Sequence, residues 1–392
     1  MKILYLTTVL PSQRKTGGEI ASQCFIDALK QGGHKVLVLG YRRQGDVVLN
    51  PVPDEMPVGY RFIETYKSKF YPLLWMGLSL ITKLPYSSAK YYSQNYIRKV
   101  TTLLNSYNYN IIILDHAQMG WLLPLINNKL PFIFIAHNIE RDIYQEQLTT
   151  TSSKVWKQIY KREAKLIQVM EDCLAKNARE VWTFTDHDAS YFSTINQATR
   201  VFHLPSSVVN LENPIVSKTC DISIIGSWTW KANMLGLKWF FQAVYPHLPT
   251  DLSIYVAGKG AEWLQGQYSN VKYCGFVPDA QEFMAQARVI AIPSISGGGI
   301  QIKTLDAIAT GTSIVATPTA MRGISEYPSS SIKVTENPKD FAHNLVELLK
   351  GKVGQIFDKE NSQELLPLNL AWSYNRREKF FADVAYALRL NS

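Results

Sequence analysis

The sequence predicts an α/β protein built from two facing doubly wound domains. Three observations lead to this prediction: short apolar runs alternate with helical patterns, the runs are apolar at consecutive positions, and the alternation is interrupted near residue 210. Strands that are apolar on both faces are typical of parallel sheets covered by helices on both sides. A length of 392 residues, 46% of them hydrophobic, provides material for two cores.

The N-terminal half supplies the first series of elements. Its expected strands are 3–8, 35–39, 111–114, 132–136 and 181–185. A loop with Gly17 and Gly18 follows the first strand, and residues 19–31 then show helical spacing. The longest expected helix is 154–177. Prolines and serines weaken the pattern after residue 204, so we expect a first domain of residues 1–210.

The C-terminal half repeats the alternation within an expected second domain of residues 211–370. Its strands are predicted at 221–225, 253–257, 272–275, 289–292 and 313–316, and its helices at 235–244 and 279–287. A last helix covers residues 372–390. Open α/β sheets bind ligands at the carboxyl ends of their strands. Because the loops of the two halves differ in chemistry, we expect two different substrates rather than one dinucleotide.

A glycine turn in the second half carries the most specific signal. Gly297, Gly298 and Gly299 follow an apolar strand, and Lys303 and Asp306 lie in the first two turns of the next helix. Exposed backbone N–H groups and the positive end of a helix favour a diphosphate, and the carboxylate could accept hydrogen bonds from sugar hydroxyls. The alternative is a tight turn whose Lys–Asp pair is solvated and worth about 0.2–0.5 kcal/mol.

Composition and spacing exclude several other classes of site. The four cysteines and seven histidines show no metal-ligand or redox spacing, and no nucleophilic triad is recognisable, so we expect no metal site. The first residues are typical of a strand rather than a secretory signal, and no apolar run reaches the roughly 18 residues that span a bilayer. We therefore expect a cytoplasmic protein.

The net charge of +9 is partly local. Residues 60–100 contain seven basic side chains against Glu64 alone, with aromatic residues between them. Such a segment suits an anionic lipid surface at the inner face of a membrane, where each Lys or Arg contributes about 1 kcal/mol. Nucleic acid is the weaker alternative, and a solvated face over a tyrosine-rich core is the simplest one.

Taken together, these motifs resemble the retaining glycosyltransferases of family 4, whose two Rossmann-like domains form the B-type fold. The likeness is strongest in the expected donor domain and looser in the first half. The segments that carry it are 224–233, 275–279 and 296–311, the last resembling the signature of the triple-glycine branch, together with Gly17, Gly18 and 136–140.

The resemblance implies sugar transfer from a nucleotide-diphosphate donor to a glycan, lipid-linked or other cell-envelope acceptor, with retention of the anomeric configuration and without a metal or other cofactor. It also implies that a helix of residues 371–392 crosses back and packs on the first domain. The implied donor-binding residues are Gly226, Ser227, Lys231, Phe276, Val277, Gly297, Gly298, Gly299, Ile300 and Asp306. The implied catalytic residues are His137 and Lys303, and the implied acceptor-side residues are Gly17, Gly18, His116, Asn138 and Glu140.

The chain departs from the family at two positions. Many members have glutamates where this sequence has Gly298 and Asp306. A catalytically weak or inactive sugar-nucleotide-binding paralogue is therefore an alternative, as is a sugar-nucleotide epimerase of the same fold. For His137, which follows an apolar strand, the alternative is a hydrogen-bonded structural residue.

Overall fold

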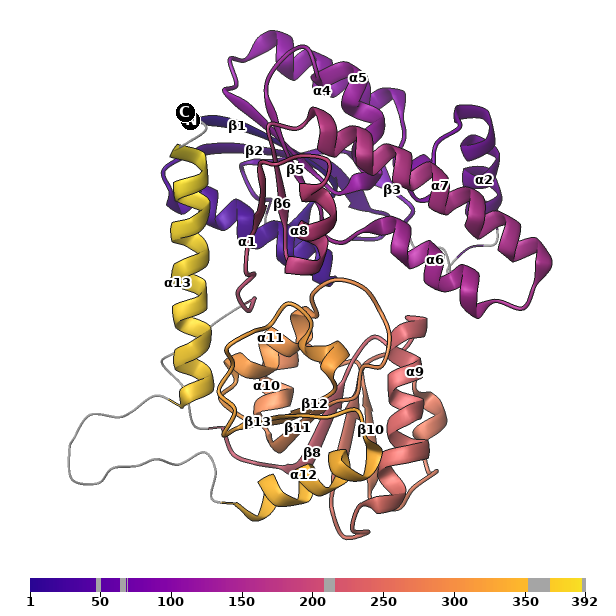
Figure 1. The fold of residues 1–392 in the computed structure, drawn as a ribbon, viewed down its shortest axis with the longest axis vertical. Coiled ribbons are helices and arrows are strands. Elements are labelled where there is room, and N and C mark those ends of the chain that lie inside the picture. The colour runs from indigo at the N-terminus through magenta and orange to yellow at the C-terminus, as the bar shows by residue number, and fades with distance from the viewer. Residues whose placement is uncertain (47–50, 64–67, 69, 208–215, 352–366, 390–392) are drawn as a thin grey trace, which may run out of the picture. The chain divides into compact units, whose positions relative to one another are not determined.

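The computed structural model describes residues 1–46, 51–63, 68, 70–207, 216–351 and 367–389 (Figure 1). The chain forms two compact units, each with its own parallel sheet. The N-terminal unit contains Met1–Phe202 and Phe381–Ser392, and the C-terminal unit contains His203–Phe380. The expected boundary near residue 210 lies outside the described residues.

The N-terminal unit contains a seven-stranded sheet in the order β3-β2-β1-β4-β5-β6-β7. Its strands are β1 (Lys2–Val9), β2 (Lys35–Arg43), β3 (Glu55–Arg61), β4 (Ile111–Asp115), β5 (Phe132–Ile135), β6 (Glu180–Thr183) and β7 (Thr199–Val201). Its helices are η1 (Pro11–Gln13), α1 (Gly17–Gln31), α2 (Phe70–Thr82), α3 (Tyr86–Ala89), α4 (Gln94–Ser106), η3 (Ala117–Leu122), α5 (Leu123–Ile126), α6 (Glu140–Thr150), α7 (Lys154–Asn177) and α8 (Asp186–Ser193). The strand order reverses between β1 and β4, which makes their carboxyl ends the topological switch point of this sheet.

The start of α1 differs from the prediction that Gly17 and Gly18 lie in a loop. Both glycines belong to the first turn of the helix. Thr16 caps this turn, because its hydroxyl oxygen accepts a hydrogen bond from the Glu19 backbone N–H at 3.3 Å. The Glu19 carboxylate in turn accepts a hydrogen bond from the backbone N–H of Lys15. Such reciprocal capping can start a helix at residues of low helix propensity.

The C-terminal unit contains a six-stranded sheet in the order β10-β9-β8-β11-β12-β13. Its strands are β8 (Cys220–Ile225), β9 (Ile254–Ala257), β10 (Val271–Gly275), β11 (Ala287–Ile292), β12 (Ser313–Ala316) and β13 (Ile332–Val334). Its helices are α9 (Lys231–Trp239), η4 (Phe240–Val244), η5 (Tyr245–His247), η6 (Glu262–Leu264), α10 (Ala280–Ala285), α11 (Ile302–Ala309), η7 (Pro318–Met321) and α12 (Pro338–Lys350). The helix expected at 235–244 thus begins four residues earlier, at Lys231, and its last five residues form a π-helical turn.

The final helix, α13, is Leu368–Arg389 and begins before the expected residue 371. Its residues up to Phe380 group with the C-terminal unit, and those from Phe381 onward group with the N-terminal unit. Among the described helices, none combines the length and the apolar character needed to cross a bilayer.

Close backbone packing fixes the C-terminal unit around the end of β11. Gly236 of α9 lies very near the segment that follows β11: a Cβ atom on Gly236 would be 2.1 Å from the carbonyl oxygen of Pro293. A second close approach joins the ends of β8 and β9, where a Cβ on Gly258 would lie 1.7 Å from the carbonyl oxygen of Gly226. Since real Cβ atoms do not approach this closely, both positions require glycine.

Candidate functional site

Two loops of the C-terminal unit meet at the carboxyl edge of its sheet. One follows β8 and contains Gly226 and Ser227, and the other is the glycine turn after β11. The strand order reverses between β8 and β11, so these loops flank the switch point at which open α/β sheets bind ligands. They approach closely, because a Cβ on Gly297 would lie 3.7 Å from the Cβ atom of Ala232 in the first turn of α9.

Lys303 connects the two loops. Its Nζ donates a hydrogen bond to Oδ1 of Asn233 at 3.2 Å, and the Asn233 amide donates to the carbonyl oxygen of Ser227 at 3.1 Å. Burial lowers the pKa of the lysine to about 8. Lys303 has no salt bridge within the described parts of the chain, so the solvated pair with Asp306 is not formed. A cation that is half-buried beside a neutral amide is well placed to receive an anion.

The glycine turn leaves backbone donors available. Gly297 and Gly299 have φ values of 112° and 66°, which lie in the region that favours glycine. α11 begins after Gln301 without a side-chain cap, whereas Asp279 and Asn337 cap α10 and α12.

The same turn contains polar atoms that point to a ligand. Ser296 Oγ is buried and has no hydrogen-bond partner in the described structure. Gly298 is exposed and Ile300 is half-buried. Uncapped helical N–H groups, an unpartnered hydroxyl and a lysine within one turn and the helix that follows it are the kinds of group that bind phosphate in proteins.

Asp306 lies one turn further along α11 and is 8% exposed. Its Oδ1 atom accepts hydrogen bonds from the backbone N–H and the hydroxyl of Ser207, at 2.8 and 2.7 Å, and from the Gln281 amide at 3.2 Å. Sequence reasoning missed both partners, which are 99 and 25 positions away along the chain. The role of this carboxylate toward ribose hydroxyls stays a prediction.

Other predicted donor-side residues lie around these loops. Lys231 and Ser227 are exposed, and Val277 is half-buried. Phe276 is 69% exposed after β10, with Nζ of Lys259 5.1 Å from its ring centroid. This aromatic ring follows β10, whereas the glycine turn follows β11.

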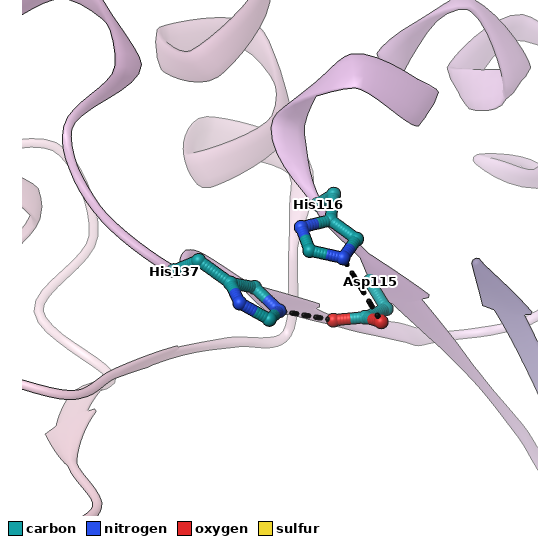
Figure 2. Close-up of side chains that lie close together, drawn as sticks. All are labelled: Asp115, His116 and His137. Carbon is teal, nitrogen blue, oxygen red and sulfur yellow. Dashed lines mark hydrogen bonds and ion pairs between the residues drawn. The ribbon is translucent and has the colours of Figure 1, made fainter. Parts of the chain in front are cut away.

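In the N-terminal unit, His116 and His137 converge on Asp115 at the ends of β4 and β5 (Figure 2). His137 Nε2 lies 2.7 Å from Asp115 Oδ1, and His116 Nε2 lies 3.6 Å from Oδ2. The two imidazole rings stack with centroids 3.8 Å apart. A Cβ on Gly18 would lie 3.4 Å from His116 and 4.0 Å from His137 Nδ1, so the structure brings three predicted residues together.

Asp115 is the residue of this cluster that the sequence did not identify. It is fully buried, and its Oδ2 accepts hydrogen bonds from Thr7 Oγ1 at 2.8 Å and from Ser22 Oγ at 2.6 Å. Burial alone would raise the pKa of Asp115, but His116, His137 and these hydrogen bonds reverse the effect and hold it well below its usual range. The carboxylate is therefore ionised and fixes the His137 ring with Nε2–H toward Asp115.

His116 has a different environment. Burial lowers its pKa to about 4, against the opposing attraction of Asp115, so the ring is neutral near pH 7. Its φ of 76° is unusual for a residue other than glycine and costs about 1–3 kcal/mol. Strain of this kind at a buried, hydrogen-bonded cluster favours a functional role over a purely structural one.

Asn138 and Glu140 lie beside the cluster. The Asn138 amide donates a hydrogen bond to Glu140 Oε1 at 3.2 Å. Burial raises the pKa of Glu140. The start of α6 is capped by Glu171, which accepts a hydrogen bond from the Glu140 backbone N–H at 2.7 Å. Glu140 makes no hydrogen bond to His137, and Gly17, the first residue of α1, has no recorded contact with the cluster.

The cluster also includes the described residues that could hold a metal ion. One ligand atom each from Asp115, His116 and His137 lies within 4.8 Å of the others. Both oxygens of Asp115 already accept hydrogen bonds or face a histidine, so a bound ion would have to displace these donors. His137 lies 21 positions after His116, and this distance explains why no ligand spacing was recognised.

Comparisons with solved structures define the fold. Sucrose-phosphate synthase from Thermosynechococcus elongatus is similar over 100% of this chain and 98% of that chain, with a TM-score of 0.69 and 13% identity. The structure of HepE from Anabaena in complex with UDP-glucose is similar over 99% of both chains, with a TM-score of 0.61 and 14% identity. WaaG, a glycosyltransferase involved in lipopolysaccharide biosynthesis, is similar over 98% of both chains, with a TM-score of 0.58 and 15% identity. The fold is therefore that of the B-type glycosyltransferases, and the prediction of two doubly wound α/β domains is confirmed.

A comparison of sequences finds a family match for part of the chain. Residues 219–351 match the family described as "Glycosyl transferases group 1". This segment includes the loop after β8, the glycine turn, Lys303 and Asp306. No curated protein matches the chain significantly. The narrower assignment to family 4 and its triple-glycine branch stays a prediction.

Proposed function

We propose that this protein is a retaining glycosyltransferase that moves a sugar from a nucleoside-diphosphate donor to a glycan or lipid-linked acceptor of the cell envelope. The observation that carries the proposal is the position of Lys303 beside the glycine turn, inside the segment that matches the glycosyltransferase family. The structure of HepE contains UDP-glucose, which supports a nucleotide sugar as donor. WaaG, which acts in lipopolysaccharide biosynthesis, supports an envelope acceptor.

The proposed donor site uses the C-terminal unit alone. The diphosphate would accept hydrogen bonds from the glycine turn and the uncapped start of α11, and Lys303 would neutralise the charge that develops on the leaving phosphate. A buried, pre-positioned cation needs no metal to stabilise this charge, so we propose a reaction that is independent of metal and of other cofactors.

The proposed acceptor side uses the Asp115 cluster. With Nε2–H of His137 held by Asp115, the other ring nitrogen, Nδ1, is left to contact a substrate hydroxyl. We assign to His137 the orientation of a sugar or acceptor hydroxyl. In a reaction that retains configuration the departing phosphate oxygen can take the acceptor proton, so a strong enzymatic base is not required. We propose that the enzyme is cytoplasmic and that binding of its acceptor brings the enzyme to the inner face of a membrane. We propose no role for nucleic acid.

A second candidate is a binding paralogue without catalytic activity. Two features favour it: Gly298 replaces a carboxylate found in many family members, and Asp306 is already hydrogen-bonded to Ser207. Such a protein would bind a nucleoside diphosphate as tightly as an enzyme does but would transfer no sugar.

One experiment separates the two candidates. UDP-, GDP-, ADP- and dTDP-sugars are tested for binding by calorimetry, and the donor that binds is incubated with acceptor glycolipids while product anomers are followed by NMR. Wild type, His137→Ala and the control His187→Ala, whose ring is 72% exposed on α8, are compared. If the protein is a retaining glycosyltransferase, an α-linked donor should give an α-linked product. Of the two variants, only His137→Ala should then lose turnover. Binding without turnover supports the paralogue, and the absence of binding by every donor refutes both.

A further inference from the structure

Helix α2 presents an apolar face to solvent. Five large apolar side chains on this helix are exposed: Phe70 (68%), Leu73 (73%), Leu74 (52%), Leu80 (61%) and Ile81 (82%). At 100° per residue they occupy an arc of about 120°, opposite the buried Trp75 and Ser79. We call these five residues the α2 apolar face. A surface helix normally directs charged residues outward, so this reversed pattern indicates that another surface covers the face.

Helix α2 is held in this orientation by buried contacts. The Arg162 guanidinium of α7 donates hydrogen bonds to Oγ and to the carbonyl oxygen of Ser79, both at 3.0 Å. Trp75 lies against Tyr71 and Tyr86, with ring centroids 5.9 and 6.1 Å away. The apolar face is therefore a fixed part of the N-terminal unit rather than the surface of a loosely attached helix.

The surroundings of this face are mainly basic, and the nearby Glu163 carboxylate is buried and paired with Arg162. Residues 65–114 contain no Asp or Glu, and the exposed Lys83 directly follows α2. On α7, the helix that makes the Arg162–Ser79 contact, four exposed lysines recur at helical spacing: Lys154, Lys157, Lys161 and Lys165. We call them the α7 lysine stripe. Its spacing places all four within an arc of about 80°.

The structure also corrects the basis of the earlier membrane prediction. Part of the basic charge expected between residues 60 and 100 turns inward: Arg61 donates to the carbonyl oxygens of Lys90 and Tyr92, and Lys99 donates to that of Pro57. Lys67 and Lys69 lie outside the described residues. The exposed cations near α2 are instead supplied mainly by α7.

We propose that the N-terminal unit docks on an anionic lipid bilayer through the α2 apolar face, with the α7 lysine stripe contacting the head groups. The helix has 13 residues, too few to span a bilayer but enough to insert one face at the interface. A second copy of the chain would fit this face less well, because pairing two such faces would bring two basic surroundings together. The proposal deepens the proposed function, on which it rests for the lipid nature of the acceptor.

Vesicle binding tests the proposal. Full-length protein is sedimented with vesicles of phosphatidylcholine, with or without phosphatidylglycerol, at low and high salt. The test variant is Leu73→Ser/Leu80→Ser. The matched control is Tyr107→Ser/Tyr386→Ser, which removes two side chains of 58% and 60% exposure elsewhere on the same unit. Lys161→Gln/Lys165→Gln tests the charge. Sedimentation velocity without lipid measures self-association.

We expect wild type and the tyrosine control to bind anionic vesicles, with salt weakening the binding. The leucine variant should bind at least 10-fold more weakly, which corresponds to about 1.4 kcal/mol. Each lysine removed should lower the affinity for anionic vesicles roughly fivefold. Equal binding by wild type and the leucine variant, or no binding by wild type, overturns the proposal. A wild-type dimer that the leucine substitutions convert to a monomer also overturns it, in favour of a second copy.

Nucleotide binding by the same preparations keeps the two proposals separate. The leucine variant should bind the donor as wild type does, because the donor site lies on the other unit. Donor binding without vesicle binding refutes only the docking proposal. Vesicle binding without donor binding refutes only the proposed function.

Discussion

Replacing Lys303 by methionine should stabilise the protein and weaken its binding of nucleotides. The Lys303 pKa falls from an ordinary value of 10.5 to about 8 because the ammonium group is buried. This difference corresponds to about 3 kcal/mol by which the charged side chain opposes folding. At pH 7 the lysine is protonated in both the folded and the unfolded chain, so this cost is fully present. Lys303→Met keeps most of the side-chain volume and removes the charge.

The effect should depend on pH in a defined direction. Between pH 8 and 10.5 the unfolded chain binds the lysine proton more strongly than the folded chain does, so the stability of the wild type rises relative to the variant. Urea denaturation at pH 7 should therefore show a gain of up to about 3 kcal/mol for Lys303→Met, and the gain should disappear toward pH 10.5.

Nucleotide affinity should change in the opposite sense. A bound diphosphate favours the charged lysine, so Lys303→Met should lose about 1.5–3 kcal/mol of binding free energy for the nucleoside diphosphate. Affinity of the wild type should also fall as the pH rises above about 8, and the variant should lack this dependence. Lys231→Met is the matched control for stability, because its ammonium group is exposed. A Lys303→Met protein that is no more stable at pH 7, or binds nucleotide as wild type does, would refute this reasoning.

Three further predictions concern two hydrogen-bonded residues described above and the proposed independence of metal. Asp115→Asn should lower kcat at least tenfold, because it disturbs the orientation of His137, and should leave donor affinity unchanged, because Asp115 lies outside the C-terminal unit; equal turnover in steady-state kinetics would contradict this. Ser207→Ala should lower the free energy of unfolding by about 1.5–3 kcal/mol, since its hydroxyl donates to the Asp306 carboxylate, and urea denaturation measures the difference. Treatment with EDTA should change neither donor affinity nor turnover; a loss restored by one divalent ion would show that metal independence is wrong.

The regular elements could be predicted from local pattern. The bounds of α7 agree with the prediction of 154–177, because apolar spacing marks its length and the Ser153 hydroxyl oxygen caps its first turn by accepting a hydrogen bond from the Trp156 backbone N–H. The start of α1 was placed too late because two glycines suggested a loop, whereas capping by Thr16 decided the outcome. Local rules of this kind act over a few residues and are visible in one sequence.

The site could be predicted only in part. His137, His116 and Gly18 were each expected near a strand or helix end, but Asp115 acquires its role from Thr7 and Ser22, which are 108 and 93 positions away. The bond between Ser207 and Asp306 crosses 99 positions in the same way. The exposure of α2 could not be predicted either, because the sequence of residues 70–82 is equally apolar whether the helix faces a core or solvent. Such features depend on which segments meet, and no spacing within one segment encodes them.

The close approach of Gly236 to Pro293 has a consequence for how the C-terminal unit recognises its ligand. Because the backbones of α9 and of the segment after β11 touch at this point, moving the start of α9 away from the glycine turn would open a close-packed contact of the unit. The groups proposed to bind phosphate would then be in place before any ligand arrives, and little conformational entropy would have to be lost on binding. In the proposed donor site, selectivity among nucleotides would then depend on groups outside the glycine turn, such as the exposed Phe276 ring.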